Sequence, residues 1–287
     1  MVKRLSIVLL LGACCGGMDL RADSRDVKIS VFADFVRSVA NERQVSLEKA
    51  ASLLYGIGVR GIDVNPDDKD LERLVATKLT PVNFYVFPDI YGVDNGASDC
   101  KRYLEKALLM KVPRMMVVPP HFTGKEAENV ELTRCVTGIR RFVEEGRKVG
   151  ITITVEDFGF RANPGSHMKN LKLFLDEIPG LKFALDSGNL YYADRGEDIV
   201  EMLKYAKGRI VHVHLKDQDE RNHQQYVSLG LGGVPNEQLV RSLAANGYDG
   251  WYTLECTVVG KDTLTDTVRQ VAVLKHWLGC DEAKCSD

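Results

Sequence analysis

The sequence predicts an α/β fold, a single (β/α)8 TIM barrel, from three observations. From Asp26 onward, short β-branched runs alternate with longer stretches at helical spacing, and there are eight such runs. Strict alternation of strands and helices predicts a parallel sheet, and eight repeats in one domain predict that the sheet closes. The 287 residues, 45% of them hydrophobic, suffice for one large core. An open doubly wound sheet is less favoured, because no G-x-G-x-x-G motif follows the first run.

The strands are expected where β-branched and aromatic residues cluster between turn residues. In chain order they are Val27–Ala33, Gly61–Val64, Val82–Phe87, Arg114–Pro119, Ile151–Asp157, Lys182–Asp186, Arg209–Leu215 and Trp251–Glu255. Apolar residues spaced three and four apart predict the helices between them. These helices are expected within 46–58, 70–79, 98–111, 128–150, 168–178, 197–206, 236–247 and 263–278. Ser46 is placed to cap the first of them, and Gly150, Gly180 and Gly208 follow helices as C-terminal caps should.

Residues 1–25 are expected to lie outside the barrel, which would cover 26–279 and leave 280–287 as a tail. Two basic residues precede a short apolar run, which is typical of a secretory signal and far shorter than the ~20 residues of a membrane span. The motif "LGAC" resembles a bacterial lipobox and makes Cys14 the expected lipidated residue. We therefore expect an exported protein, either periplasmic or a membrane-anchored lipoprotein. A plain signal peptide cleaved further along is the alternative.

The charge balance excludes an extended nucleic-acid interface. The chain has 38 basic and 40 acidic residues and a net charge of -2, with no block of like charge. Membrane contact is expected only through the N-terminal lipid, and a homo-oligomer is left open. Cys100, Cys135 and Cys256 are expected in the core, while pairing of Cys280 with Cys285 is left open.

Polar residues finish the last four expected strands. Glu156, Asp186 and Glu255 each end an apolar run, and His214 lies near the end of "RIVHVHL". The C-terminal ends of barrel strands meet at one mouth, with neighbouring strands ~4.8 Å apart. Burial of unpaired carboxylates is costly, and a shared divalent cation offsets that cost. The set predicts one Mg²⁺ or Mn²⁺ ion, for which Co²⁺ or Zn²⁺ could substitute.

The remaining candidates surround this predicted metal site. His212 and His214 share the inward face of their strand, with His212 one layer deeper as a packed or supporting group. Lys216 continues this face at the rim, where it either contacts a substrate oxygen or is solvated. His121 follows the fourth strand and is expected to face the mouth and contact substrate.

The predicted site suits proton transfer next to a carbonyl. Four protein ligands leave open positions on an octahedral ion, which a substrate carbonyl and its neighbouring hydroxyl could fill. The ion would then polarise the carbonyl and stabilise an enediolate. Glu156 and Glu255 lie on different strands and are the candidates for moving the proton.

Four motifs resemble a known family. "TVEDFG", "FALDSGNL", "IVHVHLKD" and "YTLE" occur in the order and spacing of the xylose isomerase-like barrels. More narrowly, the chain resembles the sugar phosphate isomerase/epimerase family, which includes hydroxypyruvate isomerase, ketose 3-epimerases and inosose dehydratase. The resemblance implies that Glu156, Asp186, His214 and Glu255 hold the metal, and that the two glutamates move a proton through a cis-enediolate.

Two positions depart from the ketose 3-epimerase pattern. Those enzymes usually carry a histidine three residues after the strand-six aspartate, where this chain has Asn189. They also place an arginine shortly after the strand-seven histidine, whereas Arg221 lies seven residues beyond His214. Asn189 is expected to bind a substrate hydroxyl or to cap the turn after Gly188.

The sequence thus predicts a divalent-metal-dependent isomerase or epimerase of an unphosphorylated sugar or keto-sugar. The alternative within the enzymes is a metal-dependent dehydratase (lyase) of a keto-inositol or keto-sugar. The alternative outside them is a non-catalytic carbohydrate-binding lipoprotein.

Overall fold

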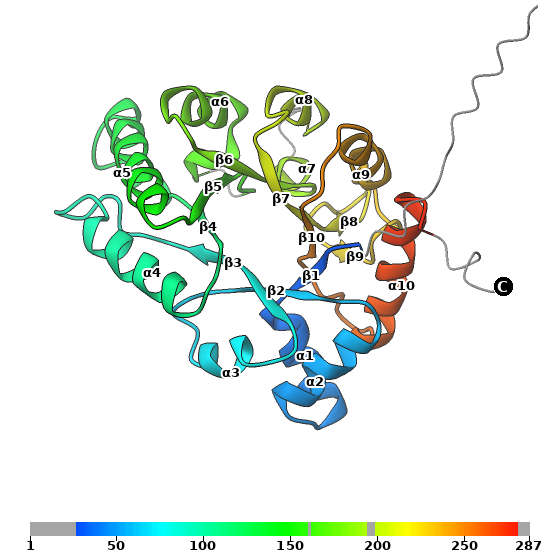
Figure 1. The fold of residues 1–287 in the computed structure, drawn as a ribbon. Coiled ribbons are helices and arrows are strands. Elements are labelled where there is room, and N and C mark those ends of the chain that lie inside the picture. The colour runs from blue at the N-terminus through cyan, green and yellow to red at the C-terminus, as the bar shows by residue number, and fades with distance from the viewer. Residues whose placement is uncertain (1–26, 160–161, 194–198, 281–287) are drawn as a thin grey trace, which may run out of the picture.

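A closed barrel of eight parallel strands forms the centre of the molecule, with helices around it (Figure 1). The computed structural model describes residues 27–159, 162–193 and 199–280. The strands pair in the order β1-β10-β7-β6-β5-β4-β3-β2, and β1 pairs with both β2 and β10 to close the ring. The prediction of a single (β/α)8 barrel is confirmed.

The barrel strands overlap all eight expected strands. They are β1 (Ile29–Phe32), β2 (Gly61–Val64), β3 (Thr80–Val86), β4 (Arg114–Val117), β5 (Thr152–Glu156), β6 (Lys182–Asp186), β7 (Ile210–Leu215) and β10 (Trp251–Leu254). Most expected strands run one or two residues past the observed C-terminal end.

The helices also follow the sequence pattern, with two additions. They are α1 (Ala33–Arg43), α2 (Leu47–Gly56), α3 (Leu71–Val75), α4 (Ala97–Leu109), α5 (Glu128–Lys148), α6 (Met168–Glu177), α7 (Asn189–Ala193), α8 (Ile199–Tyr205), α9 (Asn236–Ala245) and α10 (Thr263–Trp277). Ser46 caps α2 by accepting a hydrogen bond from the Lys49 amide at 3.3 Å. The sequence analysis missed α1 and α7. The helix α1 follows β1 without a loop or a capping side chain, so no start signal marks it.

A small hairpin leaves the barrel after β7. Its strands β8 (Asp217–Gln218) and β9 (Tyr226–Val227) pair antiparallel and are too short to give a sequence period. Beyond the hairpin, the glycine-rich loop 229–235 wraps around the Asp217 carboxylate. That carboxylate accepts hydrogen bonds from the amides of Gly230 at 2.8 Å, Gly232 at 3.0 Å and Val234 at 3.2 Å.

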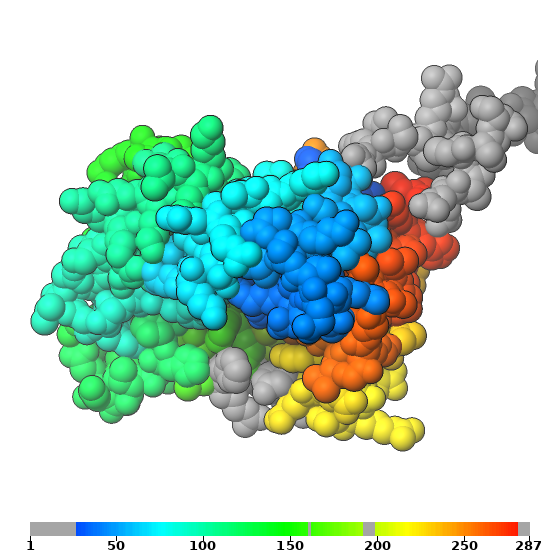
Figure 2. Space-filling view, turned by 90° about the horizontal axis from the view of Figure 1, so that it is seen from below, coloured from blue at the N-terminus to red at the C-terminus, as the bar shows by residue number. Residues whose placement is uncertain are grey.

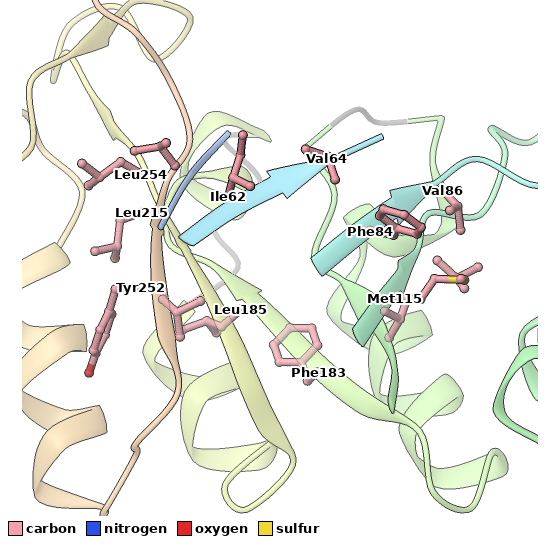
Figure 3. Close-up of a cluster of buried hydrophobic side chains, with 14 of the residues drawn as sticks. Ile62, Val64, Phe84, Val86, Met115, Phe183, Leu185, Leu215, Tyr252 and Leu254 are labelled. Atoms are coloured by element: carbon pink, nitrogen blue, oxygen red, sulfur yellow. The ribbon is translucent and has the colours of Figure 1, made fainter. Parts of the chain in front are cut away.

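The outward faces of the strands form the main core against the helices. Ile62, Phe84, Phe183, Leu215 and Leu254 are among these buried side chains, and Figure 3 shows them projecting from their strands. Each such side chain contributes about 1.5–3 kcal/mol by leaving water. Figure 2 shows α10 beside the first helices, so the last repeat packs against the first and closes the helical layer.

The inward face, by contrast, is unusually polar. Ser30, Asp63, Asn83, His212 and Thr253 are all fully buried there. Barrel interiors are usually filled by branched apolar side chains, and buried polar groups need hydrogen-bond partners. This polar interior leads to the functional site at the C-terminal end of the strands.

Several expectations fall outside the described residues. The predicted signal and Cys14 lie in 1–26, and Cys285 lies in 281–287, so the lipid anchor and the Cys280–Cys285 pair stay predictions. Among the described residues, no helix combines the length and the apolarity needed to cross a bilayer. Cys100 and Cys135 are buried as expected, whereas Cys256 is only partly buried because it follows the end of β10.

Candidate metal centre

Four side chains from four neighbouring positions on the barrel meet at its C-terminal end. Glu156, Asp186, His214 and Glu255 each offer one ligand atom, and these atoms all lie within 4.8 Å of one another. The strand register explains the convergence, because His214 on β7 is level with Asp186 on β6 and with Thr253 on β10. Asp186 and His214 are fully buried, and 21% of the Glu255 side chain is exposed. The cluster therefore lies at the inner end of the mouth, with Glu255 nearest to solvent.

Lys216 is part of this cluster and is not a solvated rim lysine. Its Nζ lies 2.6 Å from Glu255 Oε1 and 3.0 Å from Asp186 Oδ2, and the residue is only 5% exposed. Its stem passes directly over Gly188, where an added Cβ would lie 2.4 Å from Lys216 Cγ. Gly188 is therefore needed for the ammonium group to reach the carboxylates.

The carboxylates of the cluster have unused acceptor capacity that suits a cation. Glu255 Oε2 is buried and accepts no hydrogen bond from the described residues, and among these residues Asp186 Oδ2 has only its ion pair with Lys216 Nζ. Buried acceptors without donors are rare and cost free energy. Three carboxylates and one imidazole form a hard, mostly oxygen donor set, which suits a divalent ion such as Mg²⁺ or Mn²⁺. The residues present thus fit a divalent metal.

Burial and close charges shift the protonation of these groups. Burial raises the pKa of Asp186 well above its usual range, and the charge of Glu255 adds to the effect. Burial also raises the pKa of Glu156. For Glu255, burial is outweighed by the Lys216 ammonium, which lowers the pKa to about 2. For His214, burial is outweighed by the Glu156 and Asp63 carboxylates, which raise the pKa well above its usual value. Without a metal, the surroundings therefore favour a proton on His214 and on Asp186, whereas Lys216 favours the ionised form of Glu255.

Asp63 is a component of the site that the sequence analysis missed. Its Oδ2 accepts hydrogen bonds from His212 Nε2 at 2.7 Å and Asn83 Nδ2 at 2.9 Å, and lies 3.4 Å from His214 Nε2. Its Oδ1 accepts from Thr253 Oγ1 at 3.2 Å. The signal was a carboxylate in the middle of the apolar strand "GIDV", which must face inward and find partners there. Asp63 was not predicted because it lies within an early strand, whereas the predicted ligands all lie at the ends of the last four strands.

The other predicted residues divide between the site and its surroundings. His212 lies one layer below His214, fully buried, as the strand alternation indicates. Asn189 begins α7, where its amide donates to Asp186 Oδ1 at 2.9 Å and its Oδ1 accepts from Lys216 Nζ at 3.1 Å. The turn after Gly188 is therefore capped by the Asp186 carboxylate, and the expected roles of Asn189 stay predictions. His121 is exposed, with its ring 6.5 Å from that of Phe158, and is not part of the cluster.

Aromatic rings line the opposite side of the cluster. The Phe32 ring meets the His214 ring edge-on at 4.9 Å, and Tyr85 lies 5.2 Å from Phe32. These rings come from β1 and β3, whereas the ligand set comes from β5, β6, β7 and the end of β10. The centre is thus charged on one side and apolar on the other.

Comparisons with known proteins agree with this architecture. The family model described as "Xylose isomerase-like TIM barrel" matches residues 58–277. Inosose dehydratase from Mesomycoplasma hyopneumoniae (strain J) is 28% identical over 158 residues, which cover 47% of this chain and 49% of that relative. The chain thus aligns with about half the length of the curated relatives it matches.

Solved structures share the fold at low identity. An L-ribulose 3-epimerase superposes with a TM-score of 0.70 at 18% identity, over 88% of this chain and 95% of that one. The 3-keto-D-glucoside 4-epimerase of E. coli superposes with a TM-score of 0.68 at 15% identity, over 88% and 99%. The match to the family model extends over most of the barrel, from before β2 to the last residue of α10. The chain belongs to the xylose isomerase-like TIM barrel family.

Proposed function

We propose that the protein is a divalent-metal-dependent enzyme that isomerises or epimerises an unphosphorylated sugar or keto-sugar. The observation that carries the proposal is the convergence of Glu156, Asp186, His214 and Glu255, whose ligand atoms lie within 4.8 Å of one another, with a buried Glu255 oxygen that accepts no hydrogen bond from the described residues. An ion bound there would supply positive charge next to a substrate carbonyl and so favour an enediolate.

The chain provides groups for the proton transfers. Glu255 is partly exposed and kept ionised by Lys216, so it is the base that removes a proton next to the carbonyl. Glu156 lies 2.5 Å from His214 Nδ1 and has a raised pKa, so it returns a proton to the enediolate. The Lys216 ammonium donates to a substrate oxygen next to the reacting carbon.

Two further features support a neutral, hydroxylated substrate. The Phe32 and Tyr85 rings offer an apolar surface to the C–H face of a sugar. The amides of the glycine-rich loop 229–235, a usual phosphate position in this fold, already bind the Asp217 carboxylate. An exported location would agree with an unphosphorylated sugar.

Dehydration is the second candidate function, favoured by two observations. A curated relative of this chain is named inosose dehydratase. In addition, the buried Lys216 ammonium is a proton donor within the cluster, and an enediolate can expel a hydroxyl at the next carbon once that hydroxyl is protonated.

One experiment separates these candidates. The Mn²⁺-loaded protein is incubated in D2O with a panel of ketoses and keto-inositols, and the products are followed by proton NMR and ultraviolet absorbance. Isomerisation or epimerisation replaces the proton next to the carbonyl with deuterium, whereas dehydration produces an absorbing enone. Glu255→Gln is the matched control, because it removes the base while keeping the shape of the side chain.

The proposal fails if chelation does not change turnover, or if no sugar in the panel reacts. Sugar binding that chelation abolishes, without turnover of any panel member, would favour the carbohydrate-binding alternative.

A further inference from the structure

We propose that Asp63 determines which nitrogen of His214 binds the metal. Asp63 holds a proton on Nε2 of His214, so that Nδ1 is the nitrogen left to face the ion. Asp63 is thus a positioning residue and not a metal ligand. The inference rests on the metal centre of the proposed function and adds a residue from the opposite side of the barrel.

The two nitrogens of the His214 ring face different groups. Nδ1 lies 2.5 Å from Glu156 Oε1 and 3.5 Å from Glu255 Oε2, both within the proposed ligand set. Nε2 lies 3.4 Å from Asp63 Oδ2 and points toward the barrel interior. A metal-binding imidazole commonly donates its second N–H to a carboxylate, which fixes its tautomer and orientation. The direction of the ring matches this arrangement.

Asp63 is itself held in place from several sides. Asn83 Nδ2 and His212 Nε2 donate to Oδ2, and Thr253 Oγ1 donates to Oδ1. Arg114 Nη1 lies 3.3 Å from His212 Nδ1, and because an arginine can only donate, this nitrogen of His212 accepts. The proton of His212 is therefore on Nε2 and points to Asp63. These donors keep Asp63 charged and stationary in a fully buried position.

The same geometry argues against a second ion at Asp63. The ligand atoms of Asp63, His212 and His214 also lie within 4.8 Å of one another. However, Asp63 Oδ2 already accepts hydrogen bonds, and Nε2 of His212 carries a proton where an ion would need a lone pair. We therefore expect one divalent ion per chain.

The test measures metal binding and not turnover. Mn²⁺ is titrated into wild-type protein and Asp63→Asn, and free Mn²⁺ is followed by electron paramagnetic resonance. Loss of a carboxylate that orients a ligand typically weakens metal binding 10–100-fold, so we expect a shift of about this size with one ion still bound. Ser30→Ala is the matched control. It removes a buried hydroxyl that forms a hydrogen bond with Thr253 at 2.5 Å and with neither histidine, and we expect the affinity of this variant for Mn²⁺ to stay within about threefold of wild type.

A second measurement needs no variant and is therefore independent of folding defects. Selective ¹⁵N labelling of the six histidines and NMR of the Zn²⁺-loaded wild type report which nitrogen of each ring carries a proton. We expect His214 with a proton on Nε2 and the metal on Nδ1. A metal on Nε2 of His214 would overturn the inference.

The outcomes separate this inference from the proposed function. If wild-type protein binds no divalent ion, the proposed metal centre does not exist and both proposals are refuted. If wild type binds one ion and Asp63→Asn binds it equally well, only the role of Asp63 is refuted. Two ions in wild type and one in Asp63→Asn would show that Asp63 is a ligand, which also refutes it.

Discussion

Replacing Lys216 by methionine tests the electrostatics of the site without a large change of shape. Methionine keeps an unbranched stem above Gly188 and removes only the ammonium group. That group lies 2.6 Å from Glu255 Oε1, 3.0 Å from Asp186 Oδ2 and 3.1 Å from Asn189 Oδ1. The variant leaves the fully buried Asp186 carboxyl and the adjacent Glu255 carboxylate without the ammonium group that pairs with both.

The size of the effect follows from the burial of the partners. Removing one partner of a buried ion pair typically costs about 3–5 kcal/mol, because the remaining charge loses its compensation. At about 2–4 °C per kcal/mol for a large domain, the melting temperature of metal-free Lys216→Met should fall by roughly 6–20 °C. Divalent metal should stabilise the variant more than the wild type, because the ammonium no longer competes for Asp186 and Glu255. Saturation at about 100 times the Kd adds about 2.7 kcal/mol to the free energy of unfolding.

The assay is thermal unfolding followed by circular dichroism, in chelator and in excess Mn²⁺. Lys148→Met is the matched control: Lys148 pairs with Glu145 at 2.6 Å, but its side chain is 63% exposed, so its loss should change stability by less than about 1 kcal/mol. Equal melting temperatures for Lys216→Met and wild type in chelator would refute the reasoning. So would an equal stabilisation of both proteins by Mn²⁺.

Three further predictions follow from the site. Gly188→Ala should displace the Lys216 stem, since the new Cβ would lie 2.4 Å from Cγ, and should lower the free energy of unfolding by about 1–3 kcal/mol. Gly56→Ala is the control, because the new Cβ would have no atom within 4 Å. Glu255→Gln should lower kcat by about 10²–10⁴-fold if Glu255 is the base, and a loss of less than tenfold would contradict this role. The affinity for Mn²⁺ should rise with pH until the pH exceeds the raised pKa values of His214 and Asp186, because bound metal displaces their protons. An affinity that does not change with pH in isothermal titration calorimetry would contradict this prediction.

Much of the fold was predictable because the barrel repeats one local pattern. The run "KFALD" between a glycine turn and a second polar turn gives β6 with its observed bounds, Lys182–Asp186. The hairpin β8–β9 was not predictable, because strands of two residues are too short to show alternation. The helix α1 was missed although Phe35, Val36, Val39 and Ala40 have helical spacing, because a strand was expected to run into it without a boundary signal.

The candidate site was predictable to the extent that it lies at strand ends. The convergence of the four expected ligands follows from parallel strands ending at one mouth, so it could be inferred without coordinates. The burial of Lys216 could not, because it depends on the space above Gly188. The contact between Asp63 and the two histidines could not be predicted either, because β1 and β10 separate β2 from β7 in the ring and the relative register of these strands is set by the closure of the barrel.

The most direct test of the metal centre is a crystal structure of Mn²⁺-soaked protein with anomalous diffraction at the manganese edge. We predict one anomalous peak per chain, about 2.0–2.3 Å from ligand atoms of Glu156, Asp186, His214 and Glu255. An absent peak, or one bound only by Asp63 and His212, would contradict the account.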